Sequence, residues 1–101
     1  MPSNYLLTGV VIDNNELLSL EDLALALHAQ PDVIIEMIEY HFIEPRGIQP
    51  TEWRFDSLAL RRARIALSFL RELEINMAGV GLALELMDRI EALEQQLKIN
   101  T

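Results

Sequence analysis

The chain has 101 residues and a formal net charge of −8 at pH 7. This length predicts one domain, residues 1–101, built around a single modest core. Half of the residues are hydrophobic, which argues against intrinsic disorder, and the absence of cysteine excludes disulfides and thiolate metal sites. A cysteine-free chain suits the reducing cytoplasm, and the apolar run at residues 5–12 is too short to span a membrane.

The negative charge is concentrated in the N-terminal half. Residues 1–56 hold ten acidic residues against two basic ones, whereas residues 57–101 hold six of each. Two interpretations are open: a solvated acidic surface that favours solubility, and a polarised face that attracts a basic partner. The charge balance alone does not choose between them.

The N-terminal part of the chain predicts a strand followed by two helices. Residues 5–12 are rich in β-branched side chains and predict a short strand. Ser19 can cap a first helix that runs to about Ala29, because leucines follow it at helical spacing. Pro31 suits the first position of a second helix, which we expect to end near His41.

A loop and a short wing are predicted next. Two prolines and a glycine within residues 45–50 exclude a continuous helix. Trp53 and Phe55 alternate with Arg54 as in a strand, which could pair with residues 43–44. We expect Trp53 and Phe55 to be the structural anchor of this wing, and a partner-binding hot spot is the alternative.

Two further helices complete the prediction. Asp56 can cap a third helix over residues 57–75, and Asn76 can cap a fourth over residues 76–98. In the fourth helix, small and apolar residues recur at alternating intervals of four and three, which is a heptad seam. The first half of this helix is expected to pack on the domain, and the second half is suited to a partner helix. The predicted dimer interface consists of Ala83, Leu86, Ile90, Leu93 and Leu97.

The residues with catalytic or metal-binding chemistry form no recognisable site. The sequence lacks a Gly-rich phosphate loop and any Ser/His/Asp grouping in a familiar context. His28 and His41 fall on separate predicted helices, and spacing places no third ligand beside them. We therefore expect no catalytic residue, no metal, no cofactor and no small-molecule substrate.

The order of helix, turn, helix and wing is that of a winged helix-turn-helix, as in MerR-type regulators. The helix that would enter DNA carries Asp32, Glu36 and Glu39 and has no Lys or Arg. DNA binding normally draws on several basic side chains near that helix. We interpret the basic cluster at residues 61–64 as pairing with the acidic N-terminal half. Direct nucleic-acid binding is therefore not expected, and a MerR-type DNA-binding transcriptional regulator is the alternative function.

An ordered set of short motifs resembles the chaperone-modulator, or CbpM-like, family over residues 19–97. The turn at residues 28–31 departs from the pattern, since it lacks the glycine expected there. The matching motifs are Ile43-Glu44-Pro45, Trp53-x-Phe55-Asp56, Arg61-Arg62-Ala63, Leu73-Glu74-Ile75-Asn76 with Gly79-Val80, and Leu82-Ala83-Leu84-Glu85-Leu86-Met87-Asp88-x-Ile90.

This resemblance implies a mainly α fold: a MerR-like winged helix-turn-helix in residues 19–56 with short wing strands, and a long C-terminal helix used for dimerisation. It also implies a non-enzymatic modulator that binds the J-domain of a DnaJ-like, curved-DNA-binding co-chaperone. Such a protein inhibits the stimulation of Hsp70, with an effect on the co-chaperone's DNA binding as a further expectation. A basic partner needs an acidic counterpart. By charge and predicted exposure, we place the partner-binding surface at Asp32, Glu36, Glu39, Tyr40, Glu44 and Glu52.

Overall fold

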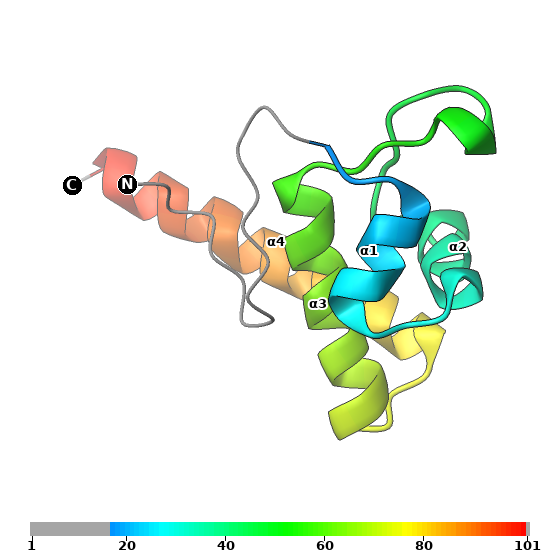
Figure 1. Cartoon of the computed structure of the whole chain (residues 1–101). Helices are drawn as coiled ribbons and strands as arrows, with labels where there is room; N and C mark the ends of the chain where they lie inside the picture. Colours follow the sequence, from blue (N-terminus) through cyan, green and yellow to red (C-terminus); the bar gives the residue numbers. More distant parts are fainter. Residues whose placement is uncertain (1–16, 101) are drawn as a thin grey trace.

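The computed structural model describes residues 17–100, so the strand expected at residues 5–12 lies outside the described part. The described residues form four α-helices and one 3-10 turn. Figure 1 shows how the four helices are arranged. The prediction of a mainly α fold is confirmed. The elements are α1 (Leu20–Leu27), α2 (Pro31–Glu39), the 3-10 turn η1 (Pro50–Glu52), α3 (Ser57–Glu72) and α4 (Met77–Asn100).

Side-chain caps set the starts of three helices. Ser19, Asp56 and Asn76 each accept the backbone N–H of the residue three positions later, at 3.1, 2.9 and 2.8 Å. Pro31 occupies the start of α2, where its missing N–H leaves no bond unmade. Each predicted cap is therefore present, and each satisfies a donor that the helix itself cannot pair.

The helix ends use left-handed residues in place of glycine. His28 has φ 53°, His41 has φ 64° and Glu74 has φ 53°. The His28 N–H donates to the carbonyls of Ala24 and Leu25, which closes α1. The turn that lacks glycine in the sequence is thus made by a histidine in a conformation that costs an L-residue about 1 kcal/mol.

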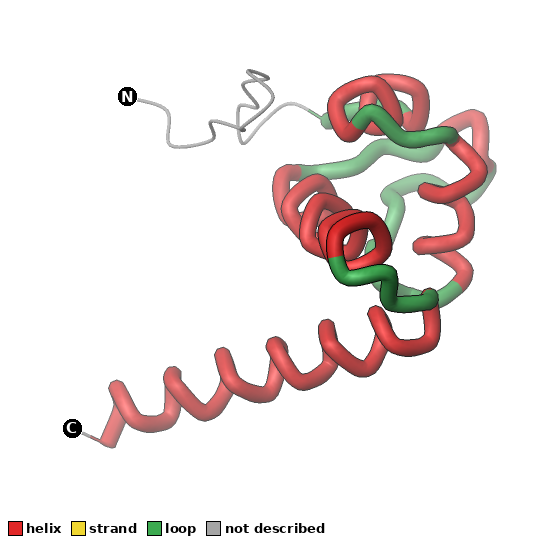
Figure 2. Tube along the Cα trace, turned by 90° about the horizontal axis from the view of Figure 1, so that it is seen from below, coloured by secondary structure: helices red, strands yellow, loops and turns green. Residues whose placement is uncertain are grey.

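The core lies where α1, α2 and α3 meet, and the first turns of α4 cover it (Figures 1 and 2). Phe55 has no exposed surface, and Trp53 is partly buried against the same core. The wing segment therefore contributes one of the largest buried side chains. The fully buried large residues are Leu23, Ile34, Met37, Phe55, Leu60 and Val80.

The wing is not the pair of strands expected from the sequence. Within residues 17–100 there is no sheet, and pairing is limited to the isolated bridges Arg46–Arg54 and Leu18–Phe55. The predicted pairing of residues 43–44 with the Trp53 strand is wrong. Pro45 has no N–H to donate, so pairing begins one residue later, where Arg46 and Arg54 exchange two backbone hydrogen bonds of 2.9 Å.

Gly47 is required for the loop that follows this bridge. Its φ of +109° is unfavourable for other residues, and a Cβ there would lie 2.7 Å from the Glu52 carbonyl oxygen. The loop can therefore fold back on η1 only with glycine at this position.

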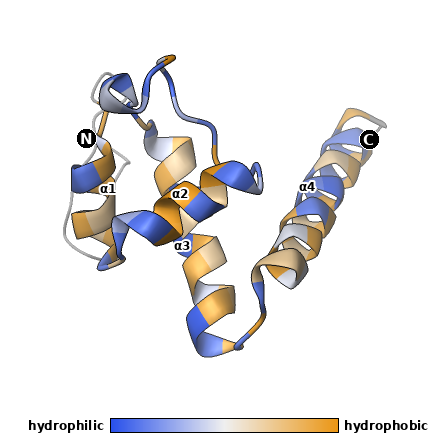
Figure 3. Cartoon of the chain, turned by 90° about the vertical axis from the view of Figure 1, so that its right-hand side faces the viewer, coloured by the Kyte–Doolittle hydropathy of each residue, from blue (hydrophilic) through white to orange (hydrophobic). Residues whose placement is uncertain are grey.

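Helix α4 leaves the three-helix body soon after it begins (Figures 2 and 3). Val80 and Leu84 are buried, and a Cβ at Gly81 would lie 3.2 Å from the Phe42 ring. Packing of the first half of α4 on the domain is thus confirmed, although the contact is shorter than predicted. Met87 is already 39% exposed, and every residue from 85 to 99 is exposed.

The predicted pairing of the arginine cluster with the acidic N-terminal half is wrong. Arg62 Nη1 lies 2.9 Å from Asp88 Oδ1 on α4, and its Nε donates to the Phe42 carbonyl at 2.7 Å. Arg61 is exposed, and Arg64 Nη2 is buried with no hydrogen-bond partner among the described residues. The net charge of each half of the chain does not show this pairing, because α3 turns Arg62 towards Asp88 on α4.

Candidate functional site

The solvent-facing side of α2 is acidic. Ile34 and Met37 point into the core, whereas Asp32, Glu36 and Glu39 are exposed. Their spacing of four and three residues places the three carboxylates on one helix face, over roughly 10 Å. In the described part of the chain, none of the three forms an ion pair. The face therefore presents three charges that no nearby cation compensates.

Tyr40 adds an aromatic group at the end of this face. It follows the last residue of α2, is 47% exposed, and its ring centroid lies 5.5 Å from that of Phe42. Phe42 is buried, so it supports the Tyr40 ring from below. Aromatic residues are enriched at the centre of protein interfaces, whereas polar residues form the rim.

The other two predicted contact residues lie in the segments after α2. Glu44 is exposed and follows the buried Ile43. Glu52 is also exposed, but its Oε1 accepts the Gln49 N–H at 3.2 Å and closes η1. The structure thus groups Asp32, Glu36, Glu39 and Tyr40 at one helix, whereas Glu52 already has a role within its own loop.

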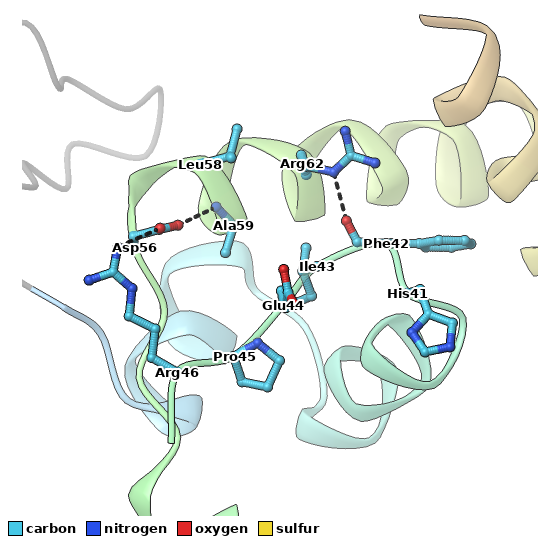
Figure 4. Close-up of a pocket in the computed structure, with 10 residues that line it drawn as sticks. All are labelled: His41, Phe42, Ile43, Glu44, Pro45, Arg46, Asp56, Leu58, Ala59 and Arg62. Carbon is cyan, nitrogen blue, oxygen red and sulfur yellow. Dashed lines mark hydrogen bonds and ion pairs between the residues drawn. The ribbon is translucent and has the colours of Figure 1, made fainter. Parts of the chain in front are cut away.

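An open hollow of about 620 Å³ lies between the segment after α2 and the first turns of α3 (Figure 4). Arg46 Nη2 lies 3.2 Å from Asp56 Oδ2 at one side of it, and Arg62 is held by Phe42 and Asp88 as described above. This hollow could not be predicted from the sequence, because its walls come from two segments separated by a loop. The lining residues are His41, Phe42, Ile43, Glu44, Pro45, Arg46, Asp56, Leu58, Ala59 and Arg62.

The predicted dimer seam lies on the part of α4 that projects from the body. Ala83 is partly buried, and the other four residues of the predicted interface, from Leu86 onward, are exposed. Leu82, which was not in the predicted set, is also 59% exposed. Such a stripe at heptad spacing is suited to a second helix. The exposed fractions are 51% for Leu86, 56% for Ile90, 58% for Leu93 and 65% for Leu97.

The remaining chemistry of the described residues is sparse. His28 and His41 lie just beyond the ends of α1 and α2, and no three His, Asp or Glu side chains within residues 17–100 are grouped to hold a metal ion. None of the helices in this range is both long and apolar enough to cross a bilayer.

Comparison with known proteins identifies the family. The model of the MerR HTH family regulatory proteins matches residues 18–99. A chaperone modulatory protein CbpM from Coxiella burnetii is 47% identical over 96 residues, which cover 95% of this chain and 91% of the relative. Proteins of the same name from Pseudomonas putida and Pseudomonas entomophila are 40% and 38% identical over 65 residues, or 64% of each chain. The chain therefore belongs to the MerR HTH regulatory family and, within it, to the chaperone modulatory proteins CbpM.

Proposed function

We propose that this chain binds the J-domain of a DnaJ-like, curved-DNA-binding co-chaperone and inhibits its action in the cytoplasm. It acts by contact, with no catalysis and no cofactor. Kinship to proteins named chaperone modulatory proteins supports a chaperone partner. The observation that carries the proposal is the exposed acidic face of α2, formed by Asp32, Glu36 and Glu39. This helix occupies the place where a DNA-binding relative would need basic side chains.

The proposed mechanism is occupation of a basic surface. A J-domain helix rich in Lys and Arg would lie along the α2 face and be withheld from Hsp70, so ATP hydrolysis would not be stimulated. Complementary charge speeds association and orients docking, but salt screens it. Tyr40, which is 47% exposed at the end of α2, supplies the apolar contact that affinity requires.

Titration of the J-domain into this protein by calorimetry tests the proposal. Reversing two charges in the double variant Glu36→Lys, Glu39→Lys should weaken binding by roughly 30-fold, if each reversal costs about 1 kcal/mol. Glu91→Lys, an exposed site on α4, is the matched control and should bind normally. Absence of binding by the wild type at low salt would refute the function. Unchanged affinity of the double variant would refute the choice of surface.

We further propose that the protein acts as a homodimer joined through α4. The support is the exposed stripe formed by Leu86, Ile90, Leu93 and Leu97 beyond the last buried residue of the helix, Leu84. A soluble monomer gains nothing from displaying such a stripe, whereas a second copy of α4 would cover it.

A MerR-type transcription regulator is the second candidate. Its support is the family match and the helix-turn-helix arrangement of α1 and α2. Against it, α2 contains no Lys or Arg. Phosphate contacts supply most of the affinity for DNA, so an acidic helix in the major groove is disfavoured. A gel-shift assay over promoter fragments decides: tight, salt-sensitive retardation would support this candidate in place of the first.

A further inference from the structure

We propose that the hollow between residues 41–46 and α3 receives one basic side chain, a Lys or Arg of the partner, with Glu44 as its counter-charge. This inference rests on the proposed function and names the chemistry of one contact within it. We call this hollow the socket. It adds a second contact to the α2 face, in which one cationic side chain of the partner is held in a fixed position.

The charge balance of the hollow leaves Glu44 unpaired. Arg46 pairs with Asp56 at 3.2 Å, and Arg62 pairs with Asp88 at 2.9 Å while also donating to a backbone carbonyl. Glu44 has no ion-pair partner among the described residues. The charges of Arg46 and Arg62 are cancelled by Asp56 and Asp88. The charge of Glu44 is therefore left over, and the net charge of this group of five residues is −1.

The walls suit the aliphatic part of a long side chain. Ile43 and Ala59 are each only 5% exposed and form an apolar floor, and Leu58 is 61% exposed at the rim. In Figure 4, Glu44 lies beside Ile43 in the middle of the hollow, with Arg46 on one side and Arg62 on the other. A Lys or Arg stem can lie on apolar surface while its charged end reaches the carboxylate. Arginine fits best, because its planar group can bind both carboxylate oxygens.

An anionic occupant is disfavoured by the same features. The charges of Arg46 and Arg62 are already offset by Asp56 and Asp88, and the carboxylate of Glu44 would repel a phosphate group. The hollow also follows closely after the acidic face of α2 in the sequence, since only residues 40–43 separate Glu39 from Glu44. Both surfaces are acidic, so both attract a basic partner.

Calorimetry with the J-domain tests the socket, and two variants that each remove one negative charge are compared. Glu44→Gln keeps the size of the side chain and should weaken binding by about tenfold, the change expected for a contact worth about 1.4 kcal/mol. The salt dependence of the affinity should become shallower at the same time. Glu74→Gln removes the same charge at the other end of α3, where the residue is exposed, and should leave affinity unchanged. Leu58→Lys should also weaken binding, because it places a cation at the rim.

The partner side of the contact is tested by charge exchange. Glu44→Arg should abolish most of the binding, and one Lys→Glu or Arg→Glu change in the J-domain should restore it. If Glu44→Gln binds within twofold of wild type while the Glu36, Glu39 double variant is weakened, the socket is refuted and the proposed function stands. If Glu44→Gln instead converts the dimer to monomer, the occupant of the hollow is a second copy of this chain and the inference fails. Absence of wild-type binding is a failure of the proposed function itself.

Discussion

Replacing Ile90 by lysine should convert the proposed dimer to monomer. Ile90 lies in the middle of the α4 stripe and is 56% exposed. Burying a whole isoleucine side chain contributes roughly 1.5–3 kcal/mol, so covering its exposed half contributes about 1–1.5 kcal/mol per protomer and about 2–3 kcal/mol per dimer. Losing this contribution raises the dissociation constant of the dimer roughly 30- to 150-fold. Two lysines facing each other in the seam add repulsion.

Sedimentation velocity across a range of micromolar concentrations measures this change. Glu91→Lys is the control, since it introduces the same lysine at the neighbouring exposed position outside the seam. At protein concentrations at which Ile90→Lys is monomeric, the wild type and the control should remain dimeric. A dimeric Ile90→Lys protein would show that α4 is not the interface, and equal dissociation of the control would show that charge on α4 is responsible, not the seam.

Three further changes act on stability and are measured by urea unfolding at one fixed protein concentration. Phe55→Ala should cost about 3–5 kcal/mol because this ring is fully buried, and a cost below about 1 kcal/mol would contradict its place in the core. His28→Gly should gain up to about 1 kcal/mol by relieving φ 53°, whereas His28→Ala should gain nothing. Arg62→Met should cost about 1–2 kcal/mol, and adding Asp88→Asn to it should cost little more, since the pair is already broken.

Local chemistry made the helices predictable. Ser19, Asp56 and Asn76 mark helix starts through bonds to residues three positions away, and Pro31 marks one by its missing N–H. Each signal is therefore complete within a few residues of sequence. The left-handed turn at His28 could not be foreseen in the same way. The turn is held by Arg71 of α3, whose Nη2 donates to the His28 carbonyl at 2.7 Å, and a contact between residues 43 positions apart is not visible in a short window.

The site was less predictable, because it depends on contacts between distant segments. The exposure of Glu36 follows from the helical period of α2, but the engagement of Arg62 by Asp88 joins residues 26 positions apart. Total charge by halves gave the wrong partner for Arg62. It also could not reveal the hollow at Glu44, which exists only because residues 41–46 cross the start of α3.

The separation of α4 from the body has a consequence for stoichiometry. The exposed part of the helix, residues 85–99, is about 20 Å long at the usual rise. In a dimer joined along these residues, the paired α4 helices would separate the acidic α2 faces of the two protomers. Such a molecule gains avidity only from a target whose own two sites match that spacing. The length of α4 would then favour partners whose two sites lie the right distance apart, independently of the charges on each acidic face.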